Sequence, residues 1–210
     1  MSFLSSKRLS SLLALAATMS LTGCYIEAGG GRNNYVPNNP VPAYPGCPAL
    51  DGGYASGLIS MSSQRGYRYS FESYAFPGSY INHYNGVGMV SYIDGRFLDE
   101  ADDATFRVVP GLADSRCISF EARNFPGSYL MNNSYDEVNL EAYNGDLAAA
   151  EDATFCPRPG LADSRYLSFE SCNQPGKFMR QDDEYLYVEG GQGVVFEDDA
   201  TFILDDAWSP

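Results

Sequence analysis

Short runs in which aromatic or aliphatic residues alternate with polar ones follow one another from Tyr67 onward. Residues 67–72 alternate in this way, and residues 79–84 and 87–93 are two further runs of strand length. Such alternation is typical of β-strands that bury one face. Phe76-Pro77-Gly78 predicts a turn after the first run, and Asp94-Gly95 predicts a hairpin after the third. Phe97 and residues 103–109 complete the unit.

This unit recurs along the chain. Ser-Phe-Glu begins at residues 70, 119 and 168, and Pro-Gly begins at 77, 126 and 175, always with a step of 49. Asp-Ala-Thr-Phe begins at 103, 152 and 199, with steps of 49 and 47, and the heptapeptide at 110–116 returns at 159–165. Asn144-Gly145 and Gly190-Gly191 take the hairpin position in the later copies. Landmarks that keep their order and spacing indicate an internal repeat.

Three units of about four strands each are too few for a β-propeller, so we expect them to close around a pseudo-threefold axis. The sequence therefore predicts an all-β protein, a β-trefoil of three internal repeats of about 49 residues, over residues 54–210. We interpret the residues shared by all copies as scaffold. The phenylalanines of Ser-Phe-Glu and Asp-Ala-Thr-Phe should fill the core, and Glu72, Glu121 and Glu170 should accept hydrogen bonds from backbone donors at strand ends.

The first 53 residues have a different composition. Lys7 and Arg8 precede a short apolar stretch at 12–19, which is too short and too mixed for a membrane span. Leu21-Thr22-Gly23-Cys24 resembles a bacterial lipobox, so residues 1–23 are expected to be a lipoprotein signal peptide, with Cys24 acylated and anchored to a membrane. An ordinary secretory signal is the alternative. Residues 24–53, rich in Gly, Asn and Pro, read as a tether.

Composition excludes several classes of protein. The net charge is −14, whereas nucleic-acid binders need clustered Lys and Arg. The chain has one His and no zinc-like cysteine spacing, and it has no phosphate-binding or dinucleotide-binding glycine motif, so we expect no metal and no cofactor. We expect an exported monomer that contacts a membrane only through its lipid anchor. The expected location is the cell envelope, at the outer membrane or cell surface, and a secreted protein is the alternative.

The remaining cysteines suit an oxidising compartment. Cys117 and Cys156 stand 39 positions apart on either side of one repeat, so a disulfide between them would clamp its first and last strands. Cys47 with Cys172 is a second possible pair, which would fix the tether to the third repeat. Free thiols are the alternative for these two.

Three segments carry a resemblance to a known family: "SFESYAFPGSYINHYNG", "DATFRVVPGLADSRCISFEARNFPGSYL" and "DATFCPRPGLADSRYLSFES". They are similar to the arabinose-binding domain of α-L-arabinofuranosidase B, carbohydrate-binding module family 42, over about residues 54–208. The resemblance implies a β-trefoil, a Cys117–Cys156 disulfide, and binding of arabinofuranosyl side chains of hemicellulose such as arabinoxylan or arabinan. Members are usually attached to a catalytic domain of several hundred residues. This sequence contains no such domain, so the resemblance implies binding without hydrolysis.

The resemblance also implies one sugar pocket for each repeat. In the family, each pocket uses a His on the strand after Phe-Pro-Gly, the residue that follows this His, and the Asp of Asp-Ala-Thr-Phe. The Asp suits a sugar because its carboxylate can accept hydrogen bonds from two neighbouring hydroxyl groups. The matching positions are His83, Tyr84 and Asp103 in the first repeat, Asn132, Asn133 and Asp152 in the second, and Gln181, Asp182 and Asp199 in the third. Only the first repeat keeps the His.

Two classes of function follow. The first is a non-catalytic module that holds arabinose-bearing polysaccharide, with several pockets gaining from multivalency. The second is a trefoil lipoprotein with degenerate pockets that acts in protein interaction or structure. The missing His in two repeats favours the second class, and the intact Asp set and the His of the first repeat favour the first. Arabinofuranosidase activity is the least favoured, because hydrolysis needs two carboxyl groups in different environments.

Overall fold

The computed structural model describes residues 47, 48, 55, 57, 58 and 68–209. The predicted signal peptide at 1–23, Cys24 and nearly all of the tether at 24–53 lie outside the described residues. The start of the repeat region, predicted at residue 54, also lies outside them.

Residues 68–209 form twelve strands and three short helices. In chain order the elements are β1 (Tyr69–Ser73), β2 (Ser79–Tyr84), β3 (Val87–Tyr92), α2 (Leu98–Asp103), β4 (Phe106–Pro110), β5 (Ile118–Ala122), β6 (Ser128–Asn132), β7 (Val138–Ala142), α3 (Leu147–Asp152), β8 (Phe155–Pro159), β9 (Leu167–Ser171), β10 (Phe178–Asp182), β11 (Tyr185–Glu189), α4 (Val194–Asp199) and β12 (Phe202–Asp206). The order strand, hairpin, helix, strand therefore occurs three times, and we call β1–β4, β5–β8 and β9–β12 the first, second and third units.

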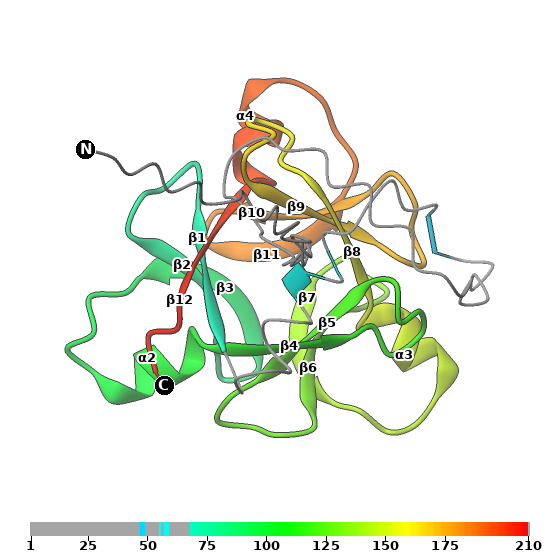
Figure 1. Cartoon of the computed structure of the whole chain (residues 1–210), viewed down its shortest axis with the longest axis horizontal. Coiled ribbons are helices and arrows are strands. Elements are labelled where there is room, and N and C mark those ends of the chain that lie inside the picture. Colours follow the sequence, from blue (N-terminus) through cyan, green and yellow to red (C-terminus); the bar gives the residue numbers. More distant parts are fainter. Residues whose placement is uncertain (1–46, 49–54, 56, 59–67, 210) are drawn as a thin grey trace, which may run out of the picture.

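Six strands close a barrel. β1 pairs with β12, β12 with β9, β9 with β8, β8 with β5, β5 with β4, and β4 with β1, all antiparallel. The other strands form the hairpins β2–β3, β6–β7 and β10–β11, which meet where β3 pairs with β7 and β11. Figure 1 shows the three units as lobes around a centre, with α2, α3 and α4 at the rim. This all-β arrangement fits a β-trefoil.

Phenylalanine side chains fill the barrel. All six phenylalanines of the Ser-Phe-Glu and Asp-Ala-Thr-Phe segments have 0% exposure, as predicted: Phe71, Phe106, Phe120, Phe155, Phe169 and Phe202. The three from Ser-Phe-Glu contact one another edge to face. The ring centroid of Phe120 lies 5.2 Å from that of Phe71 and 4.9 Å from that of Phe169, and Phe71 and Phe169 are 5.5 Å apart. This is the preferred geometry for aromatic pairs.

The glutamate of each Ser-Phe-Glu holds the turn that follows it. Glu72, Glu121 and Glu170 accept a hydrogen bond through Oε1 from the backbone N–H six residues later, at 2.6, 2.9 and 2.8 Å. The donor is always the glycine of Pro-Gly, whose φ of +85° to +86° suits glycine. The prediction that these carboxylates accept from backbone donors is confirmed. It also explains why Ser-Phe-Glu and Pro-Gly keep a constant spacing.

The predicted hairpin positions were wrong. Asp94-Gly95, Asn144-Gly145 and Gly190-Gly191 lie between a hairpin and the next helix. In the first unit the two-residue turn is instead Asn85-Gly86, with φ of 51° and 84°, between β2 and β3. Positive φ at both positions is what a tight hairpin turn with right-handed twist requires.

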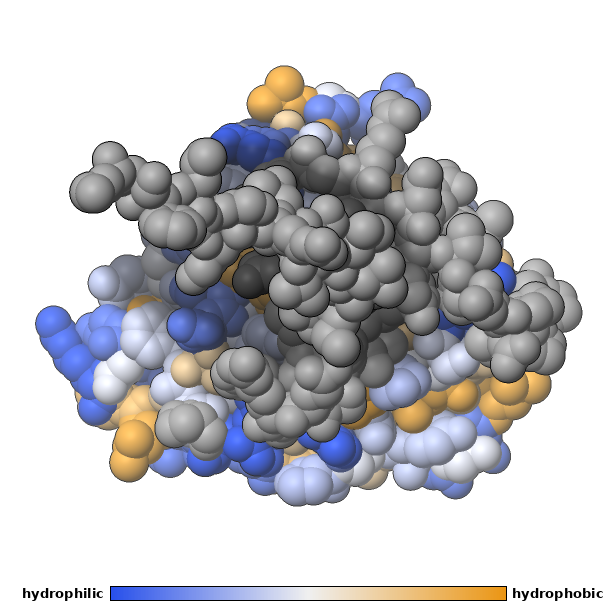
Figure 2. Space-filling model, viewed as in Figure 1, coloured by the Kyte–Doolittle hydropathy of each residue, from blue (hydrophilic) through white to orange (hydrophobic). Residues whose placement is uncertain are grey.

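The strand expected over the whole of Asp-Ala-Thr-Phe begins only at its Phe. The Asp ends a six-residue helix in each unit. These helices begin with exposed apolar residues such as Leu98, Leu147 and Val194, and Figure 2 shows apolar residues at the rim where Figure 1 places α2, α3 and α4. No helix within the described residues has the length and apolar character needed to cross a membrane.

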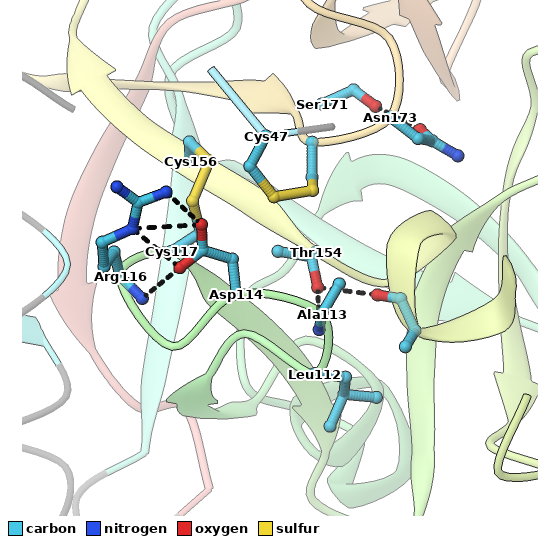
Figure 3. The surroundings of a disulfide bond; sticks show 12 residues. Cys47, Leu112, Ala113, Asp114, Arg116, Cys117, Thr154, Cys156, Ser171 and Asn173 are labelled. Carbon is cyan, nitrogen blue, oxygen red and sulfur yellow. Dashed lines mark hydrogen bonds and ion pairs between the residues drawn. A yellow bond between two sulfur atoms is a disulfide. The ribbon is translucent and has the colours of Figure 1, made fainter. Parts of the chain in front are cut away.

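The repeated heptapeptide is also scaffold. The backbone N–H of Ala113 donates to Thr154 Oγ1 at 3.0 Å, and that of Ala162 donates to Thr201 Oγ1 at 3.0 Å. The heptapeptide loop between two units is thus fastened by the Thr of Asp-Ala-Thr-Phe in the later unit, as Figure 3 shows for Ala113 and Thr154. A Cβ on Gly111 would lie 2.5 Å from the carbonyl oxygen of Asp114, so only glycine fits there.

Both predicted cysteine pairs are disulfides. Cys117 bonds Cys156 and Cys47 bonds Cys172, at sequence separations of 39 and 125 (Figure 3). Cys117, Cys156 and Cys172 are fully buried. The sulfur atoms of Cys47, Cys117 and Cys156 lie within 4.8 Å of one another, but their disulfides leave no thiolate to bind a metal ion.

Replacing Glu121 by Ala should lower the free energy of unfolding by about 1–3 kcal/mol, because it removes the acceptor for the Gly127 N–H and for Arg107. Urea denaturation measures the change. Glu141→Ala, at an exposed position on β7, is the matched control and should cost less than about 0.5 kcal/mol. Equal effects of the two substitutions would contradict the assignment of Glu121 as the holder of the turn.

Candidate functional site

A cluster of three polar side chains lies at the edge of the first unit. His83 comes from β2 and Asp103 from the last position of α2. His83 Nε2 lies 3.1 Å from Asn124 Oδ1 and 3.5 Å from Asp103 Oδ1. Asn124 closes the triangle, since its Nδ2 donates to Asp103 Oδ1 at 2.6 Å. Both neighbours of Nε2 are acceptors, so the proton of the neutral imidazole belongs on that nitrogen.

The cluster borders a pocket of about 340 Å³ between two units. We call it the first-unit pocket, and its lining residues are His83, Tyr84, Asn85, Gly86, Asp103, Phe125, Ser128 and Leu140. Phe125, Ser128 and Leu140 belong to the second unit, and the ring of Phe125 lies 5.5 Å from that of His83. His83 is only 2% exposed, whereas Tyr84 is 65% exposed at the mouth. The pocket thus has a rigid polar floor, an apolar wall and an exposed aromatic rim.

Asp103 is the negative group of this pocket. Burial raises the pKa of its carboxyl group, while the hydrogen bond from Asn124 and the nearby His83 lower the pKa in part. A carboxylate that is partly withdrawn from water, next to an imidazole, can accept hydrogen bonds from two adjacent hydroxyl groups of a ligand. The arrangement suits recognition of a neutral polyol.

The second unit fills the matching place with amides. When the Asn132 amide is oriented so that both its oxygen and its nitrogen form hydrogen bonds, it donates to Asp152 Oδ1 at 3.1 Å and accepts from Gln174 Nε2 at 2.7 Å. Asn173 also donates to Asp152, at 2.6 Å, and burial raises the pKa of Asp152. Asn133 holds the β6–β7 turn instead, because its Oδ1 accepts from the backbone N–H groups of residues 135 and 137.

The third unit uses a longer amide. Gln181 Nε2 donates to Asp199 Oδ1 at 2.6 Å, and both residues are buried. Burial raises the pKa of Asp199. Asp182 is exposed and forms an ion pair with Arg180 at 2.7 Å. The predicted residues therefore meet in the pairs His83 with Asp103, Asn132 with Asp152, and Gln181 with Asp199, while Asn133 and Asp182 stand apart from these pairs.

Four residues of the second unit take part in the site and were not predicted from the sequence. Phe125, Ser128 and Leu140 line the first-unit pocket, and Asn124 bonds Asp103 beside it. A signal was present in the turn before each hairpin. It reads Asn124-Phe-Pro-Gly in the second unit and Asn173-Gln-Pro-Gly in the third, but Ala75-Phe-Pro-Gly in the first. The Asn thus occurs only in the turns that lie next to Asp103 and Asp152.

A pocket that offers hydroxyl-binding groups and an exposed aromatic ring, on an all-β body, is typical of carbohydrate-binding modules. The profile of the Alpha-L-arabinofuranosidase B (ABFB) domain matches residues 96–204. The chain belongs to this family. No curated protein matches the chain significantly.

Solved structures support this assignment. A crystal structure of an arabinofuranosidase complexed with arabinofuranosyl-α-1,2-xylobiose is 28% identical, with a TM-score of 0.65, and the match covers 69% of this chain and 32% of that one. A GH54 α-L-arabinofuranosidase soaked with a cyclic sulfate inhibitor is also 28% identical, with a TM-score of 0.63 over 68% of this chain and 31% of that one. This chain thus spans about a third of those enzymes' length.

A more distant structure agrees on the fold alone. The BEL β-trefoil has 14% identity and a TM-score of 0.52, and the match covers 78% of this chain and 98% of that one.

Asp103→Asn should stabilise the fold at pH 7. A carboxyl group whose pKa is raised on folding favours the folded state below its unfolded pKa, and this contribution is lost as the pH rises through the folded pKa. The amide avoids burying the charge and still accepts from Asn124. Thermal denaturation should give a higher midpoint for the variant at pH 7, and the gain should shrink toward pH 3.

The exposed Asp206 provides the matched control, because Asp206→Asn should leave the midpoint at pH 7 within experimental error of the parent. A lower midpoint for Asp103→Asn at pH 7 would show that Asn124 and His83 compensate the Asp103 charge more than its burial penalises it.

Proposed function

We propose that the chain binds α-L-arabinofuranosyl side chains of hemicellulose, as in arabinoxylan or arabinan, through the first-unit pocket and without cleaving them. The grouping of His83, Tyr84 and Asp103 at one opening carries this proposal. Asp103 would accept from two neighbouring furanose hydroxyls, the His83 ring would contribute a further polar contact, and Tyr84 would cover one face of the sugar.

The relatives support the choice of ligand. One arabinofuranosidase structure is complexed with arabinofuranosyl-α-1,2-xylobiose, and the part of those enzymes that this chain matches is about a third of their length. The lining of the first-unit pocket supports binding without hydrolysis, because glycoside cleavage needs two carboxyl groups and Asp103 is the only acid among the residues that line this pocket.

We assign binding to one unit of the three repeats of about 49 residues. Asp103 and Asp152 each accept a hydrogen bond from the asparagine in the turn of the next unit, so this bond does not distinguish them. In the second and third units, an amide from the unit's own hairpin also bonds the aspartate, Asn132 to Asp152 and Gln181 to Asp199. A ligand there would have to replace those bonds, which offsets much of what it gains. The first unit has an imidazole and an open pocket at the same place.

The proposal includes export as a monomer. Residues 1–23 would serve as a lipoprotein signal peptide, Cys24 as the lipidation site, and residues 24–53 as a tether that holds the module at the cell envelope. The disulfides of the chain suit an oxidising compartment outside the cytoplasm.

The second candidate is a trefoil lipoprotein with degenerate pockets, which acts in protein interaction or structure. The amide-filled second and third units favour it, because two of the three sites no longer offer an open carboxylate.

Affinity electrophoresis separates these functions. The chain carrying Cys24→Ser, which removes the proposed lipidation site, should be retarded in gels that contain arabinoxylan but not in gels that contain the same polymer stripped of arabinose. Asp103→Ala should weaken this binding at least tenfold, because two hydrogen bonds to a charged acceptor contribute about 1.5–3 kcal/mol each. Asp152→Ala is the matched control in the second unit and should bind as the parent does.

Tyr84→Ala tests the rim without disturbing the core, since Tyr84 is 65% exposed, and it should also weaken retardation. Tyr135→Ala, at an 80% exposed tyrosine of the second unit, should have no effect. An absence of retardation on either polymer, with a native thermal transition, would reject the arabinofuranose ligand and favour the protein-interaction function.

A further inference from the structure

A second hollow adjoins the first-unit pocket. It has a volume of about 270 Å³ and shares His83, Tyr84 and Asp103 with that pocket. Its other walls come from the first unit alone, with Met89, Ser91 and Tyr92 on or beside β3 and Glu100 on α2. The two hollows therefore lie on either side of one group of polar side chains. Each is near the lower end of the ~300–1,000 Å³ range of ligand pockets, which is room for about one sugar ring.

We infer that the second hollow binds the sugar unit to which the terminal arabinofuranose is linked, and that it selects a neutral sugar over a uronic acid. The inference rests on the proposed function, because it takes the arabinofuranose to be in the first-unit pocket. It makes the ligand an oligosaccharide rather than a single arabinose.

Tyr92 supplies a stacking surface for this second sugar. Its side chain is 67% exposed, yet the ring is held from behind by the turn before β2. A Cβ on Gly78, whose φ is +86°, would lie 3.0 Å from Tyr92 Cε2. An exposed aromatic face that is fixed in place binds the apolar face of a sugar ring at little cost in side-chain entropy.

Ser91 supplies a polar contact. The buried Asn82 donates through Nδ2 to Ser91 Oγ at 2.6 Å and to the backbone oxygen of Tyr80 at 2.9 Å. Ser91 Oγ therefore accepts from Asn82, and its own proton points away from Asn82. A sugar hydroxyl in the hollow can accept that proton.

These features belong to the first unit alone. By strand register, Ser79 pairs with Tyr92 and the corresponding Ser128 pairs with Ala142, so the second unit lacks the ring. The residues paired like Ser91 are Glu141 in the second unit and Glu189 in the third. The unit that keeps the His thus also has a different second wall, which is expected if both hollows bind one ligand.

Charge explains the selection of a neutral sugar. Glu100 and Asp103 both line the second hollow, and its lining includes no Lys or Arg. A uronic acid would bring a third carboxylate into this space with no cation to compensate it, on a chain of net charge −14. A neutral pentose such as xylose or arabinose meets no such repulsion.

Titration calorimetry with the Cys24→Ser chain tests the inference. The probes are methyl α-L-arabinofuranoside, arabinofuranosyl-α-1,2-xylobiose, and an arabinofuranosyl disaccharide whose second sugar is a uronic acid. The xylobiose derivative should bind about tenfold more tightly than the methyl glycoside, since burial of on the order of 50 Å² of apolar ring face corresponds to about that factor. The uronic acid compound should gain nothing over the methyl glycoside.

Tyr92→Ala should abolish the tenfold gain and leave the methyl glycoside unaffected, and Tyr92→Phe should restore the gain. Tyr135→Ala is the control for loss of an exposed tyrosine. Glu100→Gln should improve binding of the uronic acid compound without changing the neutral one.

Equal affinities of the parent for the methyl glycoside and the xylobiose derivative would overturn the second subsite and leave the proposed function intact. If Tyr92→Ala weakened binding of the methyl glycoside and of the xylobiose derivative equally, the second subsite would likewise be overturned. No binding of the methyl glycoside would reject the proposed function itself, and the subsite with it.

Discussion

The edge-to-face contact among Phe71, Phe120 and Phe169 brings the three units together. Each ring comes from a different barrel strand, so the cluster is complete only when β1, β5 and β9 are all in place. In a strand, neighbouring side chains point to opposite faces. Once a phenylalanine points inward, the glutamate after it points outward to its Pro-Gly turn, and the turn of the second unit carries Asn124 to Asp103. Core packing thereby sets the geometry of the site.

An aspartate that is at least partly buried ends a short helix in each of the three units, and each unit supplies its hydrogen-bond donors differently. Asp103 is bonded by Asn124 and lies near an imidazole, Asp152 is bonded by two asparagines, and Asp199 is bonded by Gln181. The aspartate therefore has a structural requirement in every unit, namely a donor to offset its burial. Recognition depends on what surrounds that aspartate, and an open pocket lies beside it in the first unit.

Features set by local pattern could be predicted from the sequence, and those that depend on contact between units could not. The inward phenylalanines and the strand at 79–84 follow from alternation that the repeats reinforce. The six-residue helices were missed because so short a segment shows little helical periodicity. Asn124 was missed because it serves the aspartate of the preceding unit, 21 residues earlier. The segment that contains Asn124 is already explained as a turn, so the one signal of a further role is that the first unit has Ala75 at the same place.

The disulfide between Cys47 and Cys172 has a mechanical consequence. It joins the chain just after the Pro-rich segment to a fully buried residue of the third unit. A pull applied anywhere before Cys47 therefore enters the fold at Cys172 and bypasses the covalent path through residues 48–171. Such a force cannot peel β1 away from β12 from its end. Tension on the segment before Cys47 would thus load the hydrophobic interior of the third unit before it reached the end of β1.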